Sequence, residues 1–560
     1  MRTPFVASSL LPFLAMIACQ PGDHARTSGD KYGGTMVIAV GIDADALVPP
    51  ITVNSTSFEV DGLVFENLAR PGATLDPIGD QGWTGELADS WTWGKDSLTL
   101  AFHIDTAARW HDGIPVRASD VKFTLDLYKN PKTGSFVAPL LANIDSVSAP
   151  DSSIAVFWFK KRYPGQFYDA AYQMRILPRH ALAGTDPALL QSSPFSRHPI
   201  GSGPYRFVTW TPRQSIELQA DSSYHRGRAR IQRLIWSVAP EYNASVVRLM
   251  SGDADFLEFV APPDIQRVAH APNVKLVPYP SMSYGYLLFN ERDPGDLSKP
   301  NALFGDRALR RALTMAINRR RVTRSVFDSL GVVAYGPYTR ALPYFDSTVA
   351  ELPFSPDSAR RVLDALGWHV GADGIRSKDG RPLRFSMLVP TSSAVRMQTA
   401  VILQAMFREV GVQADVEAAD ISTVRQRNES RQFQTLIEAM QSDGNPSSIL
   451  QGWGIDAAKA KDGGNAGSYE NPQFDALVDT AIAQFDPARA RAYYFRAYSM
   501  LNEDAPAIWL WEPATVAAMQ TRIHPVDMRA DEWFANMSQW YIPSDERIPR
   551  DQIRLAEAQR

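Results

Sequence analysis

Hydrophobic and polar residues alternate along several short segments of this chain, and longer segments repeat their hydrophobic residues at helical spacing. Residues Arg384–Pro390 place apolar side chains at every second position, which is typical of a strand with one buried face. A helical pattern follows over residues 398–411, ends at Gly411, and gives way to a second alternating segment over residues 412–417. This order predicts two parallel strands joined by a helix in a right-handed crossover.

A longer helical pattern begins at Asp306, a residue type that caps helices well, and extends to Phe327. Its apolar residues Leu309, Leu313 and Ile317 recur at helical spacing, while arginines occupy the other faces. We therefore expect one helix that packs on the protein surface through a single apolar stripe.

Two further alternating segments, residues 98–104 and 154–160, predict antiparallel strands. A chain of 560 residues is long enough for two to four domains. The combination of parallel strands, antiparallel strands and helices predicts a mixed α/β protein with more than one lobe.

Charge excludes one class of partner. The chain carries 57 Lys and Arg against 61 Asp and Glu, which gives a net charge of −4. No segment concentrates basic residues in the way that a phosphate backbone requires, so we expect no nucleic-acid partner. The 13 Trp residues fit either ordinary core packing or an aromatic-lined binding surface.

The N-terminal residues have the layout of an export signal. Arg2 precedes a mostly apolar run, residues 4–18, that is too short and too interrupted by Pro to span a bilayer comfortably. Cys19, the only cysteine, follows Met-Ile-Ala and resembles the lipobox cysteine of bacterial lipoproteins, which is acylated after cleavage. We expect residues 1–19 to be the export signal and residues 20–32 to be a polar tether. No second apolar run approaches membrane-spanning length, which predicts a periplasmic or cell-surface protein anchored only by lipid at Cys19.

A Trp-His-Asp-Gly cluster, Trp110–Gly113, raises the question of catalysis. Adjacent residues on an extended strand point to opposite faces, so His111 and Asp112 cannot orient each other as a catalytic pair does. The pattern instead predicts that Trp110 and His111 end a strand and that Asp112 shapes a turn. Ser119 is then the expected cap of a helix whose inner face carries Val121, Leu125 and Tyr128.

Other constellations that indicate an enzyme or a metal protein are missing from the sequence. Residues 200–205 contain Gly-Ser-Gly but not the Gly-x-Ser-x-Gly of a nucleophile elbow. The nine His residues show no His-Glu-x-x-His or paired spacing, and there is a single cysteine. We expect no catalytic residue, cofactor or metal ligand set, although a metal or chelate site assembled between lobes stays open.

The segment Leu87–Leu127 resembles a pattern shared by family 5 of the bacterial solute-binding proteins, the peptide, nickel and oligosaccharide receptors of ABC importers. It contains Leu-Ala-x-Ser-Trp, an apolar strand, Arg-Trp-His-Asp-Gly-x-Pro and a helix that opens with Ala-x-Asp-Val. The family usually has a basic residue and a Gly where this chain has Asp105 and Ala107. Similar motifs follow along the mature chain: GGTMVIAV from Gly33, IGSGPYRFVTW from Ile200, VVRLMSGDADFLE from Val246, YPSMSYGYLLFN from Tyr279, RALRRALTMAINRRRV from Arg307, SYENPQFDALVD from Ser468 and LNEDAPAIWLWEP from Leu501.

The resemblance implies a type II periplasmic-binding-protein-like fold, in which two lobes of mixed sheets close about a hinge over a ligand. It also implies an extra subdomain in the first lobe. Leu288–Asn290 and Asp504–Pro506 are the candidate hinges, with rigid turns as the alternative. The expected divisions are residues 33–289 for lobe one, about 56–194 within it for the extra subdomain, 290–504 for lobe two, 505–543 for a return to lobe one and 544–560 for a C-terminal tail.

Candidate ligand residues also follow from the resemblance. Peptide-binding members hold the ligand ammonium with an Asp after a strand of the second lobe. Asp443 has a similar position, although its Pro comes one residue earlier than in the best-known members and the usual preceding Trp is absent; a turn-forming role is the alternative. Arg396 resembles the arginine that dipeptide receptors offer to a ligand carboxylate, with a solvated helix start as the alternative. Aromatic residues that could stack on a ligand, or simply be buried, are Tyr284, Trp453 and Trp511.

These features predict a lipid-anchored extracytoplasmic receptor that captures di- to oligopeptides in a cleft and delivers them to an ABC permease. We expect a monomer whose partners are the peptide, the permease subunits and the membrane. Within the same class, the alternative is a receptor for a nickel chelate, an oligosaccharide or another small solute. Outside it, the alternatives are a cell-wall peptide hydrolase and a ligand-sensing lipoprotein without a permease.

Overall fold

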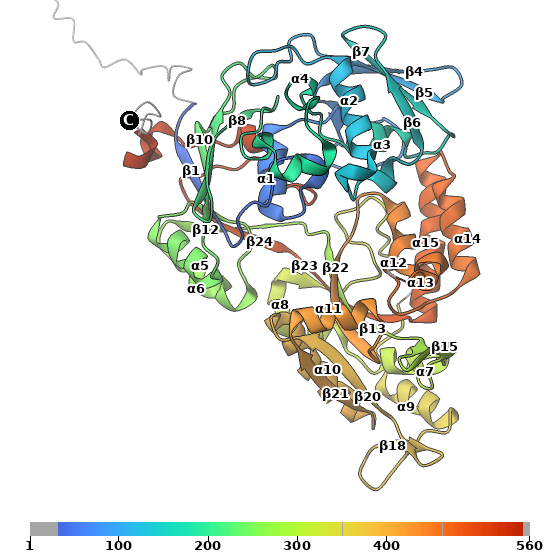
Figure 1. Cartoon of the computed structure of the whole chain (residues 1–560). Helices are drawn as coiled ribbons and strands as arrows, with labels where there is room; N and C mark the ends of the chain where they lie inside the picture. The colour runs from blue at the N-terminus through green and yellow to red at the C-terminus, as the bar shows by residue number, and fades with distance from the viewer. Residues whose placement is uncertain (1–31, 350, 462, 553–560) are drawn as a thin grey trace, which may run out of the picture.

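The computed structural model describes residues 32–349, 351–461 and 463–552, and three sheets of four or more strands organise this part of the chain (Figure 1). The mixed α/β architecture agrees with the prediction. Cys19 and the predicted export signal lie outside the described residues. Within the described residues, no helix combines the length and apolar character that crossing a membrane requires.

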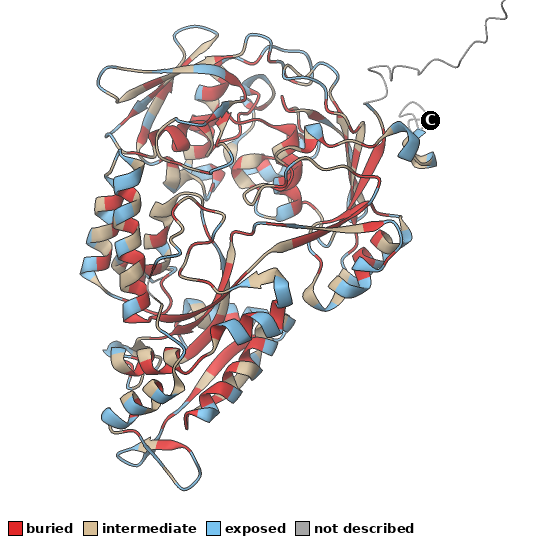
Figure 2. Cartoon of the chain, turned by 180° about the vertical axis from the view of Figure 1, so that it is seen from behind, coloured by how far each residue is buried: buried red, intermediate tan, exposed pale blue. Residues whose placement is uncertain are grey.

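The first large sheet is mixed and has seven strands. Its strand β1 pairs in parallel with β10 and β11, whereas the other neighbours pair antiparallel. β1 is buried along nearly its whole length, as expected for a central strand covered on both faces (Figure 2). The strands, in spatial order, are β12 (Val274–Tyr279), β24 (Thr515–Gln520), β11 (Phe256–Leu257), β1 (Thr35–Val40), β10 (Arg233–Val238), β9 (Ser215–Ala220) and β8 (Tyr205–Thr211).

The second large sheet has six strands and lies in the lower half of Figure 1. It contains the predicted strand, helix and strand: β20 and β21 are parallel, and helix α10 (Ala394–Glu409) connects them. Gly411 follows the helix with a φ of 81°, a left-handed conformation that glycine adopts without a steric penalty. The strands, in spatial order, are β16 (Gly331–Val332), β23 (Ala507–Pro513), β13 (Ser283–Phe289), β22 (Thr435–Gln441), β20 (Arg384–Pro390) and β21 (Gln413–Ala419).

The third sheet has four antiparallel strands and falls within residues 56–194, the segment predicted as an extra subdomain. It includes both predicted antiparallel strands, β5 and β7, which pair with each other. Helix α2 (Ala118–Lys129) packs against it through the predicted buried residues Val121, Leu125 and Tyr128. The strands, in spatial order, are β4 (Ala88–Trp93), β5 (Thr99–Ile104), β7 (Ile154–Phe159) and β6 (Ile144–Ser148).

Shorter strands and further helices complete the described part of the chain. The short strands are β2 (Ala69–Arg70), β3 (Thr84–Gly85), β14 (Arg292–Asp293), β15 (Asp296–Pro300), β17 (His369–Val370), β18 (Arg376–Lys378) and β19 (Arg381–Pro382). The other helices are α1 (Ser55–Val64), α3 (Gln166–Ala171), α4 (Arg179–Leu182), α5 (Tyr242–Ser251), α6 (Ile265–Ala269), α7 (Arg307–Met315), α8 (Arg319–Phe327), α9 (Pro356–Ala365), α11 (Ile421–Glu429), α12 (Ile449–Trp453), α13 (Ile455–Lys459), α14 (Pro472–Ile482) and α15 (Pro487–Asp504).

The chain changes from one large sheet to the other at residues 280–282, between β12 and β13, and at Ala514, between β23 and β24. These passages differ from the predicted hinges at Leu288–Asn290 and Asp504–Pro506, because β13 and β23 pair within the six-stranded sheet. The Phe289 amide donates to the Pro506 carbonyl at 3.1 Å, so both predicted segments lie at the far end of that sheet. Strand alternation identifies a buried face but not the sheet to which the strand belongs.

The helix predicted from Asp306 to Phe327 is two helices, α7 and α8, separated at residues 316–318. Asp306 caps the first, as predicted, and the Asn318 side chain caps the second. The arginines are predicted to occupy faces other than the apolar stripe, but two of them are buried: Arg310 is 3% exposed and Arg319 is 6% exposed. The Arg310 guanidinium is enclosed by acceptors: the carboxylate of Glu291 and the carbonyls of Phe304, Asp504 and Ala505.

The Trp-His-Asp-Gly cluster is structural, and two of its predicted details need correction. Asp112 accepts from the Ile114 amide at 3.1 Å, which confirms its role in the turn. His111 uses both ring nitrogens on backbone: Nδ1 accepts from the Gly201 amide and Nε2 donates to the Gly203 carbonyl. However, β5 ends at Ile104, and only an isolated bridge precedes Trp110. Arg117, not Ser119, is the N-cap of α2, because the Asp120 carboxylate accepts from the Arg117 amide at 2.8 Å.

Candidate functional site

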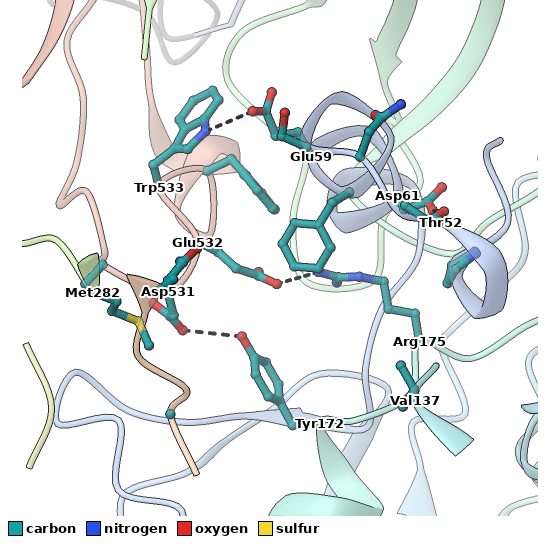
Figure 3. A pocket seen from close by; sticks show the side chains of 18 of the residues that line it. Thr52, Glu59, Asp61, Val137, Tyr172, Arg175, Met282, Asp531, Glu532 and Trp533 are labelled. Atoms are coloured by element: carbon teal, nitrogen blue, oxygen red, sulfur yellow. Dashed lines mark hydrogen bonds and ion pairs between the residues drawn. The ribbon is translucent and has the colours of Figure 1, made fainter. Parts of the chain in front are cut away.

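A cavity of about 750 Å³ lies where the two large sheets approach the segment that contains the four-stranded sheet. Figure 3 shows some of the side chains that line it. Its walls come from α1 and the loop before it, from α3 and from residues 136–140. Residues 258–259, 279–283 and 530–534 form another part of the lining, and Gln441 and Gly444 approach from the end of β22. The cavity is therefore bounded by both large sheets next to the two passages of the chain between them.

Helix α1 forms a wall of the cavity that carries acidic side chains. Asn54 caps it by accepting from the Ser57 amide at 2.9 Å. Ser55, Phe58, Glu59 and Gly62 have the spacing that places residues on one face of a helix. A Cβ at Gly62 would lie 2.3 Å from the Phe534 ring, so only glycine lets residues 530–534 pack this close to the helix.

Glu59 and Glu258 form a carboxyl pair in this wall. Glu59 is 5% exposed, and its two oxygens accept from the indoles of Trp236 at 2.8 Å and Trp533 at 3.4 Å. Glu258 accepts from the Tyr279 hydroxyl at 3.2 Å, and the two carboxyl groups are hydrogen-bonded to each other. Burial, followed by the charge of Glu258, raises the pKa of Glu59 well above its ordinary value, and burial also raises the pKa of Glu258. Burial therefore favours the protonated form of both carboxyl groups relative to an exposed Glu.

The positive charges near the cavity already have partners. Arg175, the one basic residue among the described lining residues, pairs with Glu532 at 2.5 Å and donates to the Asn67 side chain at 3.2 Å (Figure 3). Asp531 accepts from Arg529 at 2.8 Å and from the Tyr172 hydroxyl at 3.3 Å. Within the described part of the chain, no basic residue forms an ion pair with Glu59 or Glu258.

A third carboxyl group that lines the cavity lacks a hydrogen-bond donor for one of its oxygens. Asp61, on α1, is 1% exposed, and its Oδ2 accepts from the Thr52 hydroxyl at 2.6 Å. Its Oδ1 has no hydrogen-bond partner among the described residues. Burial raises the pKa of Asp61 well above its ordinary value. A buried acceptor without a donor is uncommon in a folded protein.

Apolar side chains line the more open part of the cavity. Four large apolar residues in its lining are between 45% and 74% exposed: Val53, Phe58, Phe136 and Phe259. Large exposed apolar groups that gather around one cavity are typical of a ligand-binding surface. The cavity thus combines an apolar entrance with a wall of carboxyl groups.

Of the residues predicted to bind a ligand, Asp443 lies nearest to this cavity. It follows β22 between the lining residues Gln441 and Gly444, and its side chain is exposed. Its Oδ1 accepts from the Asn445 amide at 2.7 Å, which is the hydrogen bond of a turn-forming Asp. The loop approaches the opposite wall, because a Cβ at Gly444 would lie 3.5 Å from the Tyr168 hydroxyl.

Arg396 lies at the start of α10 and pairs with Glu438 of β22 at 3.1 Å. Both side chains are mostly buried, so Arg396 is not a solvated arginine at a helix start. Among the described residues, neither of the two lines the cavity.

The predicted aromatic residues are buried on two faces of the six-stranded sheet. Tyr284 stacks on Tyr286 with ring centroids 5.6 Å apart, and Trp453 packs edge-on against Trp509 at 5.0 Å, all within one cluster. Trp511 packs against Phe327 at 5.3 Å in a different core cluster. In the described cavity lining, none of the three predicted aromatic residues is present.

Glu59, Asp61 and Glu258 were not among the residues predicted to bind a ligand. A weak signal exists in the sequence, because acidic and aromatic residues are adjacent in Phe58-Glu59, Glu258-Phe259 and Asp531-Glu532-Trp533-Phe534. That signal does not indicate that the three segments meet. In the described part of the chain, no group of three or more His, Cys, Asp or Glu is placed to hold a metal ion.

Residues 82–474 match the sequence model described as "Bacterial extracellular solute-binding proteins, family 5 Middle". The oligopeptide-binding protein AppA of Bacillus subtilis is 26% identical over 97% of this chain and 99% of its own length. The solved structure of AppA with a nonapeptide covers 91% of this chain and 99% of its own, with 24% identity and a TM-score of 0.73. The solved structure of NikZ from Campylobacter jejuni with Ni(L-His) covers 90% of this chain and 99% of its own, with 24% identity and a TM-score of 0.75. The structural likenesses show that the fold is that of solute-binding proteins.

Proposed function

The chain belongs to family 5 of the bacterial extracellular solute-binding proteins of ABC transporters, and from this premise we propose that it captures peptides and delivers them to an ABC permease. Its relatives are solute-binding proteins, not enzymes, and the family is extracytoplasmic. The name of the Bacillus subtilis relative supports a peptide as the ligand.

The observation that carries this proposal is the cavity itself. It is large enough for several residues of a peptide, and its walls come from both large sheets at the points where the chain passes between them. A ligand bound there contacts both sheets and favours the arrangement in which they are close together. The permease can then recognise the ligand-bound arrangement.

Asp443 is proposed as a ligand contact at the rim of this cavity, because its loop contributes Gln441 and Gly444 to the lining. The ligand roles of Arg396, Tyr284, Trp453 and Trp511 stay predictions, since the contacts of these side chains are with the protein. The division into lobes also stays a prediction.

We further propose that lipid on Cys19 anchors the protein. Stable anchoring normally needs two hydrophobic signals, such as dual acylation, and acylation at Cys19 is proposed to supply them. Cys19→Ala is expected to abolish acylation and move the exported protein from the membrane fraction to the soluble fraction. An unchanged membrane fraction would contradict the lipid anchor.

The ligand is best identified by mass spectrometry of molecules that co-purify with the gently isolated protein. We expect peptides at close to one per protein, released when the protein is unfolded. A stoichiometric chelate or sugar without peptides would assign the protein to another ligand class. Steady hydrolysis of added peptides would instead favour an enzyme.

A further inference from the structure

Two observations on α1 and its neighbours describe a site for a positive charge. Glu59 and Glu258 face the cavity as a carboxyl pair without an ion-pair partner among the described residues. Arg175, the basic residue of the lining, is engaged by Glu532.

On these grounds, and resting on the proposed function, we infer that the Glu59–Glu258 pair binds a cationic group of the ligand, an ammonium or a guanidinium. The protein would then prefer peptides that present a Lys or Arg side chain to this wall. An N–H donor of such a group has unused acceptor capacity available to it on the pair, because each carboxylate oxygen can accept more than one hydrogen bond.

The surrounding aromatic residues favour a cation on an apolar stem over a small inorganic ion. The Trp533 indole, which donates to Glu59, is held by stacking on Phe256 with centroids 4.5 Å apart. Phe58 and Tyr279 also line the cavity beside the pair. Aliphatic stems pack on such rings while the charged end reaches a carboxylate, and ring faces attract the cation itself.

The hydrogen bonds around Glu59 and Glu258 do not require both side chains to be acidic. A neutral amide oxygen at position 59 can still accept from Trp236, at the loss of the longer 3.4 Å bond from Trp533, and an amide oxygen at position 258 can accept from Tyr279. Two carboxyl groups side by side in a buried wall raise the free energy of the empty protein unless a proton or a cation lies between them. A ligand cation relieves this cost and lowers the affinity of the pair for protons.

The groups around the carboxyl pair indicate which side chain releases a proton when a cation binds. Trp236 and Trp533 face Glu59, and Tyr279 faces Glu258. The other charged residues lining the cavity are Asp61, Arg175, Asp531 and Glu532. Arg175 pairs with Glu532 and Asp531 pairs with Arg529, while Asp61 points away from Glu59 on α1 toward Thr52, so the carboxyl pair is the group expected to release a proton when a cation binds to it.

The test uses the full chain and a pool of synthetic hexapeptides in which one position is Lys, Arg, Gln or Met. Retained peptides are separated by rapid gel filtration and counted by mass spectrometry. An N-acetylated copy of the pool distinguishes a side-chain cation from a terminal ammonium. The variants are Glu59→Gln and Glu258→Gln, whose amides resemble a protonated carboxyl group in size. Glu217→Gln, which alters an acidic residue of the same seven-stranded sheet outside the cavity, is the matched control.

We expect the wild-type protein and the control to retain Lys and Arg peptides at least tenfold over Gln and Met peptides. Both cavity variants should retain neutral peptides as before and lose this preference. Calorimetry of one Lys peptide in buffers of different ionisation enthalpy should show proton release by the wild type, which keeps the test decisive if one variant fails to fold. Retention without a charge preference, or a preference that survives both substitutions, would overturn the inference and leave the proposed function standing. If the wild type retains no peptide, the proposed function fails and the inference fails with it.

Discussion

Two buried carboxyl groups in this protein have opposite surroundings. Glu438, in the six-stranded sheet, is paired with Arg396 at 3.1 Å, and an internal cation completes its site. Glu59, in the wall beside the seven-stranded sheet, is bonded to two indoles and to the carboxyl group of Glu258. Burial raises the pKa of both Glu438 and Glu59, so burial alone does not identify a ligand site. The difference is that one carboxyl group has its counter-ion within the fold and the other faces a cavity without one.

The largest effect is expected at Glu438, the buried carboxyl group that has its counter-ion, Arg396, within the fold. Arg396→Met should leave Glu438 buried without its cation and lower the free energy of unfolding by about 3 kcal/mol, the low end for buried pairs because both side chains are partly exposed. Urea unfolding measures this change. The double variant Arg396→Met/Glu438→Leu should recover most of the loss. If the single variant is as stable as the wild type, Arg396 is not a structural counter-ion, and its predicted ligand role regains support.

The next effect concerns the carboxyl pair that lacks a counter-ion. A Lys-containing peptide at about 100 times its dissociation constant should raise the free energy of unfolding of the wild type by about 2.7 kcal/mol. If Glu59→Gln weakens binding tenfold, the same peptide concentration should stabilise that variant by only about 1.4 kcal/mol. Thermal unfolding with and without peptide measures both values, and small-angle scattering should show compaction of the wild type. Equal stabilisation of the two proteins would remove the contrast between Glu59 and Glu438.

A third buried site adds a titratable counter-ion to the comparison. The His225 ring lies between Glu66 at 3.0 Å and Asp105 at 2.8 Å, and its side chain is 1% exposed. Burial opposes protonation, but the hydrogen bonds and charges of the two carboxylates outweigh it and raise the pKa of His225. The stabilisation is therefore complete below the unfolded pKa of about 6.5 and is lost as pH rises through the higher folded value.

For this site, His225→Gln is expected to cost about 1.5 kcal/mol at pH 6 and less at pH 8, since hydrogen bonds to charged groups are worth roughly that amount. Urea unfolding at both pH values checks this, with His198→Gln at an exposed histidine as the control. A cost that grows between pH 6 and pH 8 would mean that the ring is neutral in the folded protein.

The smallest effect is expected at Asp443, which is exposed and has a turn hydrogen bond to Asn445. Asp443→Asn keeps an acceptor for that turn and removes only the charge. Because an exposed ion pair is worth about 1 kcal/mol or less, the affinity for a free-amine peptide should fall by about fivefold or less. Calorimetry with the free and the N-acetylated peptide measures the charge contribution. A loss of a hundredfold would make Asp443, and not the Glu59–Glu258 pair, the main partner of the ligand ammonium.

Much of the local structure was predictable from the sequence, because the periodicity that reports a buried face is local. The segment from β20 through α10 to β21 and the pairing of β5 with β7 appear as predicted. The failures occur where a local pattern is compatible with two outcomes. The helical pattern from Asp306 continues through the break at residues 316–318, because apolar spacing is preserved across it. Arg310 is buried because backbone carbonyls from distant segments surround it, which no helical pattern records.

The candidate site was less predictable than the fold. The motifs along the chain indicated its family, and the family implied a ligand site between two lobes. They directed attention to Tyr284 and Trp511, which are buried in the six-stranded sheet, and to Trp453, which is buried at the end of helix α12. The carboxyl groups that line the cavity come from segments far apart in the sequence, and no motif links them.

The sequence by itself determined the elements and the family, since hydrophobic spacing and motif order depend on neighbouring residues. Only the tertiary structure decided that β13 and β23 belong to the six-stranded sheet, which places the passages at residues 280–282 and at Ala514. It also decided which carboxyl groups found a cation inside the protein. Glu438 meets Arg396, whereas Glu59 meets Glu258, because electrostatic partners are chosen by proximity in space after the chain has folded.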